Sequence, residues 1–253
     1  MNRRELVLGM GGLTLQRFAL AAKPFASPAP YQSASREQAG AVPLPQSVAG
    51  VRLVDSKIAG KATALAQSVY LPYLFNHAVR TYLLGSLTGR AQGQHFDEEL
   101  LFLACILHDI GLTERFEGDL PFEIQGAESA KRFLEENAYT ADGIQTVWDG
   151  IAMHASAIGQ FKRPEIALVG DGAGADVLGP DSSQIERSDL DEILKAFPRL
   201  GFKVAFIQTC ADVLRKHPRS ASRGFMRDIG ERYVHDFHPH NFCDLLAQAP
   251  FPD

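Results

Sequence analysis

Hydrophobic positions along most of the chain recur with the period of an α-helix. After Asp142, apolar residues follow the spacing i, i+3, i+4, i+7, i+8 and i+11 from Ile144 to Ala155, which predicts an amphipathic helix with an acidic cap. The segment from Leu74 to Leu87 has the same spacing, with Pro72 near its start. Further helices are predicted at 127–137, 164–178, from 188 onward, 202–216 and 225–234. No segment alternates as a half-buried strand would, so we predict an all-α fold.

One predicted helix is apolar on every side. Leu100 to Leu107 are all hydrophobic, a run compatible with either a buried strand or a buried helix. Asp97 is a good N-cap, Glu98 and Glu99 favour the positive end of a helix dipole, and Gly111 supplies a stop. These flanks favour a helix, which we expect to lie at the centre of the core.

The first fifty residues differ in composition from the rest. They carry five basic and two acidic residues and five of the fourteen prolines, as linkers do. The paired Arg3 and Arg4, before a weakly apolar stretch, resemble a twin-arginine export signal, with an amphipathic helix or a tail as the alternative. We therefore predict a signal and linker over 1–50 and one compact multi-helix domain over 51–253. An export signal would place the protein in the periplasm or outside the cell; otherwise it is cytoplasmic.

Charge and cysteine content exclude several classes of function. The whole chain has a formal net charge of −5, and without its basic front the charge of the remainder falls to −8, which disfavours nucleic acid as a partner. No apolar run reaches the roughly 18 residues of a membrane span, so stable membrane insertion is not expected. Three cysteines without CxxC spacing indicate neither a disulfide framework nor a zinc ribbon. A small-molecule substrate fits best, and a homo-oligomer is compatible with the sequence. The basic group that includes Arg199 could steer an anion toward the site, but a solvated helix face is the favoured interpretation.

The dipeptide His108-Asp109 stands at the end of the most apolar helix. Burial of such a polar pair is costly unless a partner satisfies it, and a divalent cation would do so because imidazole nitrogen and carboxylate oxygen are common metal ligands. The alternative is a C-cap pair that bonds the last helical carbonyls. His77 on one predicted helix and Asp176 on another add to the metal interpretation.

The pattern His77, then His108-Asp109, then Asp176 resembles the HD-domain metal-dependent hydrolases. The segments Leu107–Thr113, Phe122–Ala127 and Trp148–Gly179 look most like the cyanamide hydratase branch of that superfamily. The resemblance implies one divalent metal ion held by His77, His108, Asp109 and Asp176, with zinc expected first and iron or manganese as alternatives. The glycines at 170, 172 and 174 are interpreted as sites of close helix packing.

The same resemblance implies a metal-dependent hydro-lyase. A divalent ion lowers the pKa of bound water to roughly 7, and the resulting hydroxide would hydrate a small nitrile-like substrate, as in conversion of cyanamide to urea. Such a reaction needs a general acid, for which His154 is the candidate, and Glu123 in the presumed loop before 127 is the candidate for orienting substrate. The alternatives for these two are a hydrogen-bonded boundary histidine and a solvated loop carboxylate.

Two other functions remain open from the sequence. A mononuclear-metal phosphohydrolase acting on a nucleotide or phosphate ester would need cations beside the metal, and the residues around His77 and His108 supply only Arg80 and Arg115. A helical binding module without catalysis is the third class. Retention of all four candidate ligands favours an enzyme over that module.

Overall fold

The computed structural model describes residues 43–181, 184–220, 224–239 and 241–248. Most of the predicted signal and linker lies outside these residues. A short antiparallel hairpin pairs β1 (Ser47–Val48) with β2 (Val51–Arg52). The predicted boundary between linker and domain, at position 51, therefore falls within this hairpin. The division into a signal and linker and one domain stays a prediction. None of the helices in the described residues combines the length and apolar character needed to cross a membrane.

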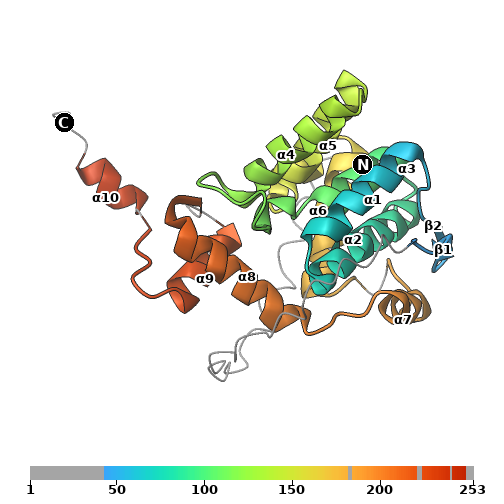
Figure 1. The fold of residues 1–253 in the computed structure, drawn as a ribbon. Coiled ribbons are helices and arrows are strands. Elements are labelled where there is room, and N and C mark those ends of the chain that lie inside the picture. The colour runs from blue at the N-terminus through green and yellow to red at the C-terminus, as the bar shows by residue number, and fades with distance from the viewer. Residues whose placement is uncertain (1–42, 182–183, 221–223, 240, 249–253) are drawn as a thin grey trace, which may run out of the picture. The chain divides into compact units, whose positions relative to one another are not determined.

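Helices make up nearly all of the described fold (Figure 1), and the predicted all-α class is confirmed. In chain order they are α1 (Lys57–Val69), α2 (Pro72–Ala91), α3 (Glu98–Leu107), α4 (Phe122–Glu136), α5 (Ala141–Met153), α6 (Pro164–Leu178), α7 (Arg187–Ala196), α8 (Phe202–Lys216), α9 (Gly224–Tyr233) and α10 (Phe242–Ala247). Short 3-10 turns cover Ile110–Leu112 (η1), Ala157–Phe161 (η2) and Pro218–Ser220 (η3).

The core lies where α2, α3 and α6 pack together. Every residue of α3 from Leu100 to Leu107 is buried, as the continuous apolar run predicts, and Asp97 caps the helix by accepting from the amides of Glu99 and Leu100. Helices α2 and α6 cross at very short range, because an added Cβ on Gly172 would lie 2.1 Å from the Thr81 carbonyl oxygen. The prediction of close packing is confirmed for Gly172 and for Gly170, where an added Cβ would lie 2.9 Å from the His154 carbonyl oxygen, but it is wrong for Gly174, which has no atom within 4 Å of that place.

Several element boundaries differ from the sequence predictions. Helix α4 begins at Phe122, five residues before its predicted start, so Glu123 lies in a first helical turn and not in a loop. Helix α5 is capped by Thr140, whose side chain accepts from the Gly143 amide, while Asp142 lies in the first turn. Helix α1 was not predicted, because its buried face consists largely of alanine and gives little hydrophobic contrast.

Candidate metal centre

Two helices bring three polar side chains to one buried point. His77 lies in the middle of α2, His108 caps the C-terminus of α3, and Asp109 follows in the turn that leads to η1. All three are at most 1% exposed. The turn is held tightly against α4, since a Cβ on Gly111 would lie 2.1 Å from the Phe122 carbonyl oxygen. Glycine at this position allows the close contact with α4, which holds the turn after α3 in place.

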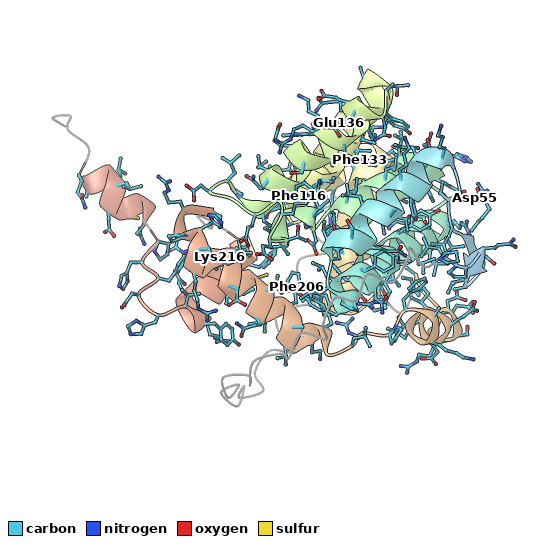
Figure 2. The ribbon with its side chains drawn as sticks, in the orientation of Figure 1. Asp55, Phe116, Phe133, Glu136, Phe206 and Lys216 are labelled. Atoms are coloured by element: carbon cyan, nitrogen blue, oxygen red, sulfur yellow. The ribbon has the colours of Figure 1, made fainter. Side chains whose placement is uncertain are left out.

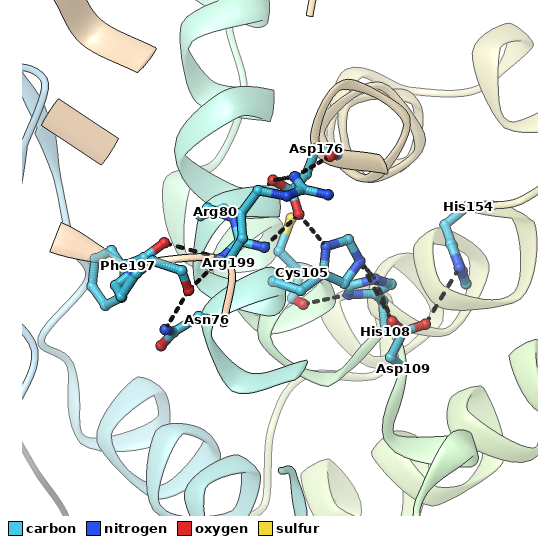
Figure 3. A network of polar contacts seen from close by, with 11 residues as sticks. Asn76, Arg80, Cys105, His108, Asp109, His154, Asp176, Phe197 and Arg199 are labelled. Carbon is cyan, nitrogen blue, oxygen red and sulfur yellow. Dashed lines mark hydrogen bonds and ion pairs between the residues drawn. The ribbon is translucent and has the colours of Figure 1, made fainter. Parts of the chain in front are cut away.

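The triad, as we call His77, His108 and Asp109, converges through one atom of each side chain (Figure 3). Nε2 of His77 lies 3.2 Å from Nε2 of His108. Oδ2 of Asp109 lies 3.5 Å from the first of these nitrogens and 3.3 Å from the second. Such separations match those between neighbouring ligands of a divalent ion with bonds of about 2.0–2.2 Å.

Hydrogen bonds on the far side of each ring fix what the triad atoms can do. Nδ1 of His108 lies 2.8 Å from the Cys105 carbonyl oxygen, which only accepts, so that nitrogen is the donor. Nδ1 of His77 lies 2.7 Å from Oδ2 of Asp176 and donates for the same reason. In neutral imidazoles both Nε2 atoms then carry lone pairs. With both rings neutral, three acceptors therefore face one another, and a cation is a partner that all three could bind.

The burial and the pKa of Asp109 also favour a positively charged partner. Its Oδ2 is buried without a hydrogen-bond partner among the described residues, which is costly for a carboxylate oxygen. Burial acts to raise the pKa of Asp109, but the imidazoles, His108 foremost, outweigh it and hold the pKa well below its ordinary value. Burial acts to lower the pKa of His108. The negative charge of Asp109 outweighs this effect, so the pKa of His108 is raised above its ordinary value. The donor set and the orphaned oxygen fit a divalent metal ion.

His154 lies beside the triad without joining it. It caps the C-terminus of α5, where its Nδ1 lies 2.7 Å from the Ile151 carbonyl oxygen and donates to it. Its Nε2 lies 3.8 Å from Oδ1 of Asp109, the carboxylate oxygen that faces away from the triad. Burial, reinforced by His108, lowers the pKa of His154 to about 4. The ring is thus neutral at pH 7, with a lone pair on the nitrogen that points toward Asp109.

Glu123 supplies a carboxyl group from the first turn of α4. Burial raises its pKa to about 7, and the negative charge of Asp109 adds to the shift. At neutral pH this carboxyl is therefore protonated about half of the time, unlike an ordinary glutamate. Glu123 is therefore a carboxyl group whose protonated form is well populated at neutral pH.

This shift predicts a pH-dependent stability for Glu123→Gln. Because the folded-state pKa is raised, the wild type keeps its full stability below the ordinary pKa and loses it as the pH rises through about 7. In metal-free protein, the free energy of unfolding of the variant should rise relative to that of the wild type between about pH 4.5 and pH 8. The difference should reach about 3 kcal/mol at the upper end. Urea unfolding across this range measures the gain. A difference that stays constant with pH would contradict the raised pKa.

Asp176 lies on the other side of His77. It projects from α6, and its Oδ2 accepts from Nδ1 of His77 at 2.7 Å. Arg80 binds the same carboxylate with two donors, Nε to Oδ1 and Nη2 to Oδ2, both at 2.7 Å. Arg199 adds a contact of 2.9 Å to Oδ1. The structure brings Asp176 to the centre, but against the ring nitrogen that faces away from the triad.

Aromatic rings pack against the imidazoles. The ring centroid of Phe202 lies 4.8 Å from that of His77, and that of Phe122 lies 5.6 Å from that of His154. The aromatic wall, as we call the group, consists of Phe122 on α4, Phe202 and Phe206 on α8 and Phe225 on α9; Phe206 is labelled in Figure 2. It gives this side of the centre an apolar lining.

Sequence reasoning missed two residues at this centre. Arg199 belongs to the basic group interpreted as a solvated face; for Arg199 that interpretation is wrong, because its guanidinium bonds the side chain and the backbone oxygen of Asp176. Tyr70, just after α1, is 4% exposed and its pKa is raised by burial and by Asp109. The sequence signal for Tyr70 is its position just before α2, the helix that carries His77, and this signal is weak.

Comparisons with known proteins match the region that holds the centre. Residues 74–196 match the family model described as "HD domain", a range that contains the triad, Glu123 and His154. A stretch of 78 residues, 31% of this chain, is 28% identical to an "Uncharacterized protein" of Clostridium beijerinckii. The match covers 50% of that protein, so the chain spans about half the length of the relative.

Proposed function

Because residues 74–196 carry an HD domain, which indicates a metal-dependent hydrolase-type function, we propose that this protein adds water to a small, uncharged, nitrile-like substrate such as cyanamide. The observation that carries the proposal is the aromatic wall against His77 and His154. Aromatic and apolar linings with few polar groups suit small uncharged ligands.

The triad would hold the metal, through Nε2 of His77, Nε2 of His108 and a carboxylate oxygen of Asp109. Zinc is the metal proposed, since nitrogen and carboxylate ligands suit it, with iron or manganese as alternatives. When bound, a divalent ion acts as a Lewis acid and lowers the pKa of water.

The two neighbouring groups divide the proton transfers between them. His154 has an unprotonated Nε2, because its Nδ1 donates to the Ile151 carbonyl, so it suits acceptance of a proton from the attacking water. Glu123, with a pKa of about 7, suits delivery of a proton to the nitrile nitrogen. This division differs from the roles that the sequence suggests, in which His154 is the acid and Glu123 orients the substrate.

The cations near the triad favour this substrate over a phosphate ester. Arg80 is fully buried, and its guanidinium donates to Asp176 and to the carbonyl oxygens of Phe197 and Pro198. Arg115 is exposed and lies over the Phe116 ring. Recognition of phosphate needs free donors that converge beside the metal, and neither of these two arginines supplies them. A phosphohydrolase is therefore the second candidate.

The proposed function is tested by turnover of purified, zinc-loaded protein on cyanamide and on a panel of phosphodiesters and nucleotides. Formation of urea without ammonia supports the proposal. Turnover of the phosphate panel alone would replace it with the phosphohydrolase, and turnover of neither substrate class would reject both.

Replacement of His154 by glutamine should lower kcat by about 10²–10⁴-fold, the usual contribution of a positioned acid or base. Glutamine can still accept a hydrogen bond but cannot take up a proton. Zinc content, measured by mass spectrometry, should stay at the wild-type level because His154 lies outside the triad. A parallel loss of zinc would show that His154 is a ligand instead.

A further inference from the structure

We infer that Asp176 is a positioning residue for His77 and that the metal ligands of this centre are the three triad residues alone. The inference rests on the proposed metal site and concerns how the site is built. It departs from what the resemblance to HD-domain proteins implies, in which Asp176 is the fourth ligand.

The hydrogen bonds of Asp176 leave no lone pair for a metal. An ionised carboxylate has about four acceptor positions. Oδ1 accepts from Nε of Arg80 and from Arg199, while Oδ2 accepts from Nη2 of Arg80 and from Nδ1 of His77. The carboxylate is therefore saturated, in contrast to Asp109, whose Oδ2 has no partner among the described residues.

The position of Asp176 explains how His77 presents its metal-binding atom. A carboxylate on Nδ1 fixes the proton there and leaves a lone pair on Nε2, the nitrogen that faces His108 and Asp109. Such partners orient metal-binding histidines and raise their basicity. Arg80 and Arg199 in turn hold the carboxylate (Figure 3). Asp176 would therefore act on a bound metal only through the imidazole.

The arrangement also settles how many coordination positions the protein fills. With three protein ligands, a tetrahedral ion keeps one position for water or substrate, which is typical of catalytic zinc sites, whereas four ligands are typical of structural ones. With Asp176 excluded as a ligand, the triad would therefore leave such an ion with an open position, as in catalytic sites.

Metal binding by variants tests the inference. Asp176→Asn should still bind one equivalent of zinc, with an affinity reduced about 10–100-fold, and its cobalt-substituted form should keep the absorption bands of the wild type. Asp109→Asn should lose stoichiometric binding. Glu165→Gln is the matched control, because Glu165 is a buried, arginine-paired carboxylate on the same helix, and its zinc affinity should match the wild type.

A second measurement uses the wild type and does not depend on how well a variant folds. In zinc-loaded protein labelled with ¹⁵N-histidine, His77, assigned through His77→Gln, should show a protonated Nδ1 and a metal-bound Nε2. Metal bound at Nδ1 of His77, or loss of zinc by a folded Asp176→Asn as complete as that by Asp109→Asn, would overturn the inference. If the wild type binds no zinc, the proposed function itself fails; the Nδ1 proton of His77 in the metal-free protein then decides separately whether Asp176 orients that ring.

Discussion

Replacement of His108 by alanine is expected to remove the metal and abolish turnover. Loss of a residue that only supports a ligand costs about 10–100-fold in metal affinity. Since we propose that His108 supplies one of three ligand atoms, the loss should exceed 100-fold. Without the ion, water at pH 7 keeps its ordinary high pKa. Zinc content by mass spectrometry and turnover on the substrate identified for the wild type measure the two effects.

The matched control is His95→Ala, which removes an exposed histidine from the segment before α3. It should leave both zinc content and turnover at wild-type levels. If His108→Ala keeps one equivalent of zinc, the triad is not the metal centre, whatever its activity.

The largest effect on stability is expected from Gly172→Ala. The added methyl carbon would lie 2.1 Å from the Thr81 carbonyl oxygen and 2.9 Å from the Gly85 nitrogen, both backbone atoms that cannot rotate away. Overpacking in a core costs about 1–3 kcal/mol and sometimes more, and a clash between two helix backbones belongs at the upper end. We expect a loss of about 3 kcal/mol in the free energy of unfolding, measured by urea denaturation.

Gly174 on the same helix provides the opposite case. No atom lies within 4 Å of the place where its Cβ would be, so Gly174→Ala should stabilise the protein by about 0.4–1 kcal/mol through the better helix propensity of alanine. If the two variants are equally stable, the close approach of α2 and α6 is not present in solution.

The sequence predicts those parts of the fold that depend on local periodicity. Helices α6 and α8 have the predicted bounds, because Pro164 is the first residue of α6, Gly201 precedes α8, and a clear apolar pattern follows in each. The start of α4 was missed because Pro121 offers no side-chain cap and Phe122 alone signals burial. Periodicity alone could not place that boundary, which depends on the contact between η1 and α4.

The candidate site was predictable in its residues and less so in its geometry. His77, His108 and Asp109 stand out because polar groups inside apolar helices need partners. Arg80 carried the same signal, since it lies one turn after His77 on an apolar helix, yet its partner Asp176 is 96 positions away. Only the packing of α6 against α2 shows that Asp176 faces Nδ1 of His77 and not Nε2.

The arginine that holds Asp176 also reaches a distant part of the chain. Arg80 donates to the carbonyl oxygens of Phe197 and Pro198, and Asn76 donates to Pro198 as well; both donors flank His77 on α2. The connection between α7 and α8 is thus hydrogen-bonded to the helix that carries His77, a proposed metal ligand. By thermodynamic linkage, an ion that stabilises this arrangement of α2 should also protect the backbone amides of Phe197 and of residues 199–201 from hydrogen exchange. Occupancy of the centre is therefore readable at a segment that never touches the ion.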